Sequence, residues 1–254
     1  MTKIKRHRNG QILLLAILLI SLLMISTQLY VYEVSRSTVA FSPPNINSYV
    51  LSIKLGSEHV VTGALANISN GGEKSTLSTN LDEWTSFIEN QYQFGKPILD
   101  SDFPDNPLYI MGTRLSWSTN GFGISSTVSD FNLSILDNPI NAQLSFRINI
   151  TTSLLQIVEG RVVQNDVKQI NVTSSLSNEG NPALGTNVTV LFQDTGVWKP
   201  AQNQSGYFSI DYGNGTYLSS FEVDTPQVSM EISVCAIDLR GIYVQANSTC
   251  TIAT

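Results

Sequence analysis

Residue types that carry nucleophilic or metal chemistry are scarce in this chain of 254 residues, which holds two histidines and two cysteines. His7 lies in a basic leader and His59 in a predicted helix, so outside that leader no two histidines can pair in a metal site or a catalytic triad. The sequence also lacks phosphate-loop, nucleophile-elbow and zinc-protease motifs. We therefore expect a protein that is not an enzyme, with no cofactor and no metal.

The best remaining candidate for chemistry is a cluster of three aspartates, Asp100, Asp102 and Asp105. Their oxygens are the hard ligands that calcium prefers, but the glycine and the closing glutamate of a calcium-binding loop are missing, and Met111 occupies the twelfth position. A solvated, proline-containing loop explains the cluster better. A surface hydrolase built on two carboxylates stays the weakest of the functions considered, because no pair of carboxylates is singled out.

Asparagine side chains offer candidate sites of covalent modification. Eight Asn-x-Ser/Thr sequons follow the apolar segment described below, where a glycosylating compartment would meet them. They begin at Asn67, Asn132, Asn149, Asn171, Asn187, Asn203, Asn214 and Asn247. A surface rich in Ser, Thr and Asn is the alternative explanation, so we expect only some of these sites to carry a glycan.

The two cysteines, Cys235 and Cys250, lie in or after the last two predicted strands. In a regular hairpin Cys235 would pair near Tyr243 or Val244, which leaves Cys250 roughly 20 Å farther along at about 3.3 Å per residue. A disulfide needs Cα atoms within about 7 Å, so it forms only if the tail after Asn247 folds back. Export would favour pairing, and the sequence leaves the disulfide open.

An uncharged apolar segment dominates the N-terminal part, from Gln11 to Tyr32, with no proline or glycine inside it. About 20 such residues in a helix cross a hydrocarbon core of roughly 30 Å. Four basic residues precede it within the first eight positions, which predicts a cytoplasmic N terminus. We expect a basic leader over 1–10, a transmembrane helix over 11–36 that contacts membrane lipid, and an extracellular chain after about residue 36.

A basic leader that ends in Gly10 and continues at once into Gln11 and an apolar helix resembles the class III signal peptides of archaeal type IV pilins and pilin-like proteins. The resemblance implies cleavage by a prepilin-type peptidase between Gly10 and Gln11, with the helix retained. Family members often carry glutamate at the fifth mature position, where this sequence has Leu15. The alternatives are cleavage at the exit of the helix, near Glu33, and an uncleaved anchor.

Two helices are predicted directly outside the membrane, within a helical hairpin over 37–95. Apolar residues recur with a helical period from Ile46 to Ile68, although Gly56 and Gly63 weaken the pattern. Asn70-Gly71-Gly72 ends this first helix. The second helix is expected to begin with an N-cap box at Thr79 and Asp82, and to bury one face. That face comprises Leu77, Leu81, Trp84, Ile88 and Tyr92.

From Gly95 onward, turn residues recur every eight to twelve positions and the alternation becomes that of strands. The predicted strands are Tyr109–Trp117, Ser125–Leu136, Ala142–Val158, Val167–Leu176, Asn187–Phe192, Tyr207–Asp211, Thr216–Val223, Val228–Ile237 and Ile242–Ala246. We expect a β region over 96–155 and an immunoglobulin-like β-sandwich over 156–254, so the fold class is mainly β with N-terminal helices. Tyr217, at the start of a strand after a glycine-rich turn, resembles the tyrosine corner of such sandwiches. A type I′ hairpin at Asn214-Gly215 explains the same residues equally well.

After Gly10, ten basic residues face twenty acidic ones, a net charge of −10, which disfavours binding to phosphate backbones. Nucleic acid is therefore not an expected partner. Two hypotheses fit best. The first is a cell-surface structural or interaction protein, pilin-like, which bundles with copies of itself through the apolar helix. The second is a monomeric, membrane-tethered module that binds a glycan, a surface-layer protein or a solute.

Overall fold

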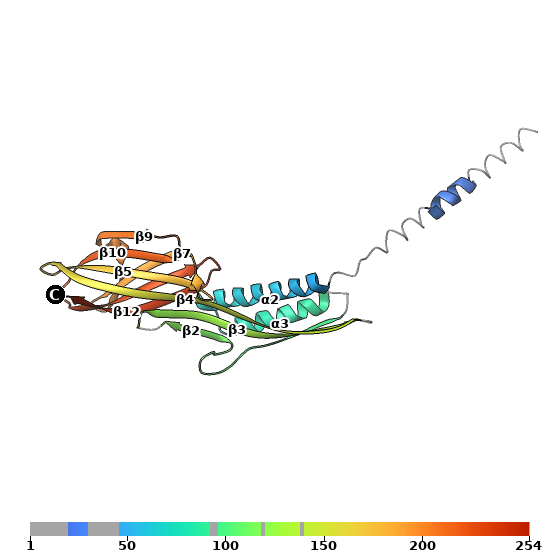
Figure 1. Ribbon diagram of the computed structural model, residues 1–254, viewed down its shortest axis with the longest axis horizontal. Helices are drawn as coiled ribbons and strands as arrows, with labels where there is room; N and C mark the ends of the chain where they lie inside the picture. Colours follow the sequence, from blue (N-terminus) through green and yellow to red (C-terminus); the bar gives the residue numbers. More distant parts are fainter. Residues whose placement is uncertain (1–19, 30–45, 92–95, 118–119, 138–139, 254) are drawn as a thin grey trace, which may run out of the picture. The chain divides into compact units, whose positions relative to one another are not determined.

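The computed structural model describes residues 20–29, 46–91, 96–117, 120–137 and 140–253 (Figure 1). Contacts divide the chain into two compact units, 1–52 and 53–254. Strands make up most of the second unit, which confirms a mainly β protein with helices on its N-terminal side.

The described part of the first unit is helical at 20–29 and again where α2 (Ile46–Ser69) begins. Within the helix at 20–29, the Thr27 hydroxyl bonds back to the carbonyls of Leu23 and Met24, both at 2.9 Å, as expected for a polar residue inside an apolar helix. In the described part of the chain, no helix combines the length and the apolar character needed to cross a membrane. The rest of the predicted segment 11–36, the leader, Gly10 and Gln11 lie outside the described residues.

The two helices predicted within residues 37–95 are present, as α2 and α3 (Thr76–Gln91). Most residues of their predicted faces are buried, and Ile53, Val61, Ala64, Leu65, Ile68, Leu77, Leu81 and Ile88 are all at most 3% exposed. Trp84 is half-buried, and Tyr92 lies outside the described residues. The predicted cap was wrong, because the backbone N–H of Thr79 already bonds to the carbonyl of Ser75 at 3.0 Å. Thr79 therefore lies inside the first turn, and α3 begins three residues earlier than predicted.

The first of two hydrogen-bonded sheets contains most of the strands. They are β1 (Pro97–Asp102), β2 (Thr113–Trp117), β3 (Phe122–Asp137), β4 (Ile140–Gln164), β5 (Val167–Asn178), β6 (Asn181–Pro182), β9 (Ser205–Asp211) and β10 (Thr216–Asp224). β3 and β4 form a long antiparallel ribbon, visible in Figure 1, in which Phe122 pairs with Leu155 at one end and Asp137 with Ile140 at the other.

The second sheet contains β7 (Gly185–Asp194), β8 (Val197–Pro200), β11 (Ser229–Asp238) and β12 (Tyr243–Ala253), and η1 (Ala201–Asn203) follows β8. A short parallel pairing of β12 with β4, at Ile252 and Gly160, joins the two sheets into one curled sheet. A shared core lies between them, where the rings of Phe192 on β7 and Phe221 on β10 are 5.5 Å apart.

The strand pattern departs from the prediction in several places. β1, β6 and β8 were not predicted, and β2 begins at Thr113 rather than at Tyr109, because Met111 and Gly112 form a turn with φ of 51° and 75°. The predicted boundary between residues 155 and 156 falls inside β4. Contacts group residues 53–254 into one compact unit.

Tyr217 is the second residue of β10, which follows β9 after a loop of four residues, 212–215. Its side chain is 5% exposed, and its hydroxyl accepts a hydrogen bond from the backbone N–H of Gly185 at 2.7 Å. The hairpin is confirmed, but the type I′ turn is not, because Gly213 and Gly215 have positive φ whereas Asn214 does not.

Candidate functional site

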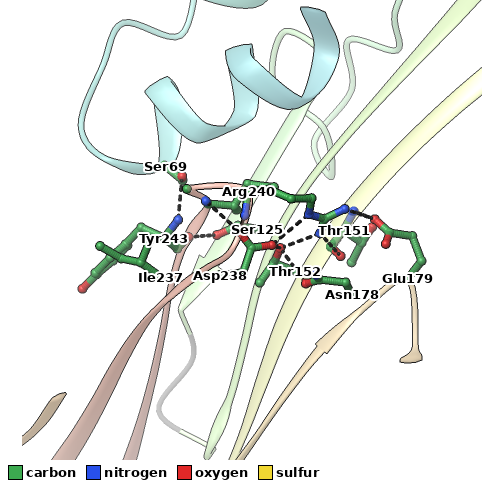
Figure 2. A network of polar contacts seen from close by, with 12 residues as sticks. Ser69, Ser125, Thr151, Thr152, Asn178, Glu179, Ile237, Asp238, Arg240 and Tyr243 are labelled. Atoms are coloured by element: carbon green, nitrogen blue, oxygen red, sulfur yellow. Dashed lines mark hydrogen bonds and ion pairs between the residues drawn. The ribbon is translucent and has the colours of Figure 1, made fainter. Parts of the chain in front are cut away.

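A polar network links the turn between β11 and β12 to β4 and β5 (Figure 2). Asp238 is buried, and its Oδ1 atom accepts the backbone N–H groups of Arg240 and Ile242, both at 2.9 Å. Its Oδ2 atom accepts the Thr152 hydroxyl and Arg240 Nε, again at 2.9 Å each. Arg240 also reaches Glu179 through Nη1 at 2.8 Å. Both oxygens of a buried carboxylate are therefore satisfied by this turn and by β4.

The same turn is connected to the C-terminal end of α2. Ser69 accepts the backbone N–H of Tyr243 at 3.0 Å, and Asn70 donates its amide to the carbonyl of Gly241 at 2.8 Å. Burial acts to lower the pKa of Arg240, but the bonds to Glu179 and Asp238 outweigh it and raise that pKa above its usual value. This network is a structural joint, because every group in it already has a partner within the chain.

The sequon asparagines all lie at the surface of the second unit. Six are exposed, while Asn171 and Asn247 are half-buried. Those on β3, β4 and β5 lie on the outer face of the first sheet, and those on β7 and β12 lie on the outer face of the second. Strand alternation thus directs every strand sequon away from the core, and glycosylation stays a prediction.

The structure does not bring the two cysteines together. Met230 pairs with Cys250 and Cys235 pairs with Gln245, so the two thiols are separated by five residues along the hairpin, roughly 16 Å. Cys250 is buried in the shared core, whereas Cys235 is half-buried on the outer face and accepts the Tyr243 hydroxyl at 3.1 Å. Both are free thiols, so the disulfide that the sequence left open is not formed.

The acidic cluster supports its own loop. Asp102 caps the backbone N–H of Phe103 at 2.8 Å, and Asp105 accepts that of Met111 at 3.0 Å. Across the described ranges, no three His, Cys, Asp or Glu side chains are grouped so that they could hold a metal ion. His59 lies on the exposed side of α2, as predicted for a helix-surface residue.

A pocket of about 290 Å³ was not predicted from the sequence. It lies between the end of α2, the turn before α3, the loop over 103–112 and β2, and its two cationic lining residues are Lys74 and Arg114. Sequence analysis had no signal for it, because the two cations are isolated along the chain and only the fold brings them to one pocket.

No protein family matches this chain, and no curated protein sequence matches it significantly.

Proposed function

We propose that this chain is a cell-surface structural or interaction protein, with the apolar N-terminal helix as its anchor and the β-rich unit outside the membrane. The exposure of the helix at 20–29 carries the proposal. Its large apolar side chains, Ile20, Leu22, Leu23, Met24, Ile25 and Leu29, are 58–67% exposed. A continuous apolar surface of this kind is stable only against lipid or against other apolar helices.

The β-rich unit, residues 53–254, supports a role outside the cytoplasm. Its two sheets enclose one core, and the buried Tyr217 hydroxyl bonds to the backbone at Gly185, which favours an immunoglobulin-like sandwich. Surface asparagines in eight sequons and the acidic composition fit a domain displayed outside the cell.

The leader supports pilin-like processing between Gly10 and Gln11, and N-terminal sequencing of the protein from membranes tests it. The wild-type chain should start at Gln11, and a Gly10→Val variant should keep Met1. A wild-type start near Glu33 would instead mean a secreted chain, and an intact Met1 in both would mean a plain anchor.

Self-association through the anchor is tested by photo-cross-linking in the membrane. A photoreactive residue placed at Leu22, which is 63% exposed, should capture a second copy. The matched control is Val228, which is 70% exposed in the β-rich unit and should give no dimer through the helix. If only monomers form at Leu22, and no filaments are sheared from the cells, the chain acts as a monomeric tethered module instead. The pocket near Arg114 favours that second function, because a binding module needs a concave site.

A further inference from the structure

We propose that the pocket beside Arg114 binds a carboxylate carried on an apolar body. The inference goes beyond the proposed anchoring and does not depend on it, because every residue of the pocket lies in the unit 53–254. The pocket has a volume of about 290 Å³, large enough for a group of several carbon atoms.

Two buried polar groups at the pocket lack partners. The Nε atom of Arg114 is buried, and no hydrogen-bond acceptor for it exists among the described residues. The hydroxyl of Thr113, a residue only 5% exposed, is also without a partner in the described part of the chain. Buried donors in folded proteins are nearly always satisfied, so the unsatisfied Nε of Arg114, a residue that lines the pocket, indicates a missing acceptor.

Charge identifies the acceptor as an anion. Lys74 and Arg114 both line the pocket, and neither takes part in an ion pair within the described residues. The chain after Gly10 has a net charge of −10, so two unpaired cations at one pocket form a local exception that attracts an anion. The planar guanidinium of arginine matches a carboxylate through two parallel hydrogen bonds.

An unusual turn lies between Ile110 and Thr113, two residues that line the pocket. Met111 and Gly112 adopt left-handed conformations, with φ of 51° and 75°. The Asp105 carboxylate holds the N–H of Met111 at 3.0 Å, and the Gly112 carbonyl accepts the Thr127 hydroxyl at 3.0 Å. Such conformations persist where the surroundings determine them fully, and they cluster at ligand sites. Arg114 follows this turn directly, so its backbone is positioned before any ligand arrives.

Apolar side chains at the same pocket specify the rest of the ligand. Leu108, Ile110 and Leu115 line it and are 54%, 50% and 36% exposed. An aliphatic body covers these side chains and removes them from water. Inorganic phosphate and an acidic sugar offer the same negative charge without an apolar surface, so both should bind more weakly.

Calorimetric titration of the full-length protein in detergent micelles tests the site with hexanoate as the probe. Hexanoate should bind with a dissociation constant on the order of 1 mM. Hexanamide, which has the same body without the charge, should bind at least about tenfold more weakly, and so should glucuronate and inorganic phosphate. If hexanamide binds as tightly as hexanoate, the pocket does not recognise a carboxylate. If glucuronate or phosphate binds more tightly than hexanoate, the pocket does not recognise an apolar body.

Substitutions distinguish binding at the pocket from a general effect of the protein's net charge. Arg114→Gln should weaken hexanoate binding at least about tenfold, while Arg161→Gln, which removes one exposed positive charge away from the pocket, should leave it unchanged. Should Arg114→Gln fail to fold, Lys74→Gln in the exposed turn before α3 gives the same test, with a loss of about threefold or more. The proposal fails if hexanoate shows no saturable binding, or if Arg161→Gln weakens binding as much as the pocket variants.

Discussion

The Nε atom of Arg240 donates a hydrogen bond to Oδ2 of Asp238, two residues earlier in the same turn, at 2.9 Å. The Asp238 side chain is fully buried at 0% exposure, whereas the Arg240 side chain is 25% exposed. The arginine therefore neutralises an interior carboxylate from the surface, and its other nitrogens continue to β4 and to Glu179. This one carboxylate holds the turn to β4, and the end of α2 is joined to the same turn separately, through Ser69 and Asn70.

Replacing Asp238 by asparagine should therefore lower the free energy of unfolding by about 3 kcal/mol or more, because it leaves Arg240 without its buried counter-charge. Asp130→Asn is the matched control, since Asp130 pairs with Arg147 at the surface, with side chains 41% and 67% exposed. Its effect should stay within about 1 kcal/mol. Denaturant unfolding of the full-length chain gives both values, and equal effects of the two substitutions would contradict the role of Asp238.

Sequence alternation predicts those strands that bury one face. The alternation of Val228, Met230, Ile232 and Val234 predicts a common face for these four residues. The last three are buried, whereas Val228 lies just before β11 and is 70% exposed. β1 escaped prediction because Pro97–Asp102 contains a proline and two aspartates, and it is a strand only through its pairing with β3, far along the chain. The start of α3 was misplaced because Ser75, Thr76 and Thr79 are all residue types that cap helices.

The two glycines of α2 provide a second prediction. A Cβ atom at Gly63 would meet nothing within 4 Å, so Gly63→Ala should stabilise the protein by about 1 kcal/mol through helix propensity. A Cβ atom at Gly56 would lie 2.3 Å from the Trp84 ring, which is held by a hydrogen bond from its Nε1 to Ser57 at 2.9 Å. Gly56→Ala should therefore destabilise the protein by about 1–3 kcal/mol. Melting temperatures of the two variants should shift in opposite directions, and a shift of the same sign would refute this packing of α2 against α3.

The pocket also escaped sequence analysis, for a reason that differs from those given for β1 and for the start of α3. Lys74 precedes α3 and Arg114 lies on β2, and neither is part of a recognisable motif. The left-handed conformation of Met111, which follows the pocket residue Ile110, could not be predicted from the sequence either, because methionine rarely adopts that conformation. Local patterns specify elements, whereas this pocket arises from contacts between elements that are distant in sequence.

Removal of the Tyr217 hydroxyl gives a third prediction. In Tyr217→Phe the backbone N–H of Gly185 loses its acceptor at a buried position, so the free energy of unfolding should fall by about 1–3 kcal/mol. Tyr212→Phe makes the same chemical change in the neighbouring loop, where the side chain is 56% exposed, and should have almost no effect. Equal stability of the two variants would show that the tyrosine merely packs.

Alkaline pH should destabilise the protein through Cys250. Burial raises the pKa of this thiol from 9.0 to about 11, because the interior disfavours the thiolate. The unfolded chain releases the thiol proton near pH 9 while the folded chain retains it, so this contribution to stability is complete below pH 9 and is lost as the pH rises towards 11. Denaturant unfolding at a series of pH values should show a smaller alkaline loss in Cys250→Ala than in Cys235→Ala. If the two variants lose stability in parallel between pH 9 and 11, Cys250 does not keep its proton in the core.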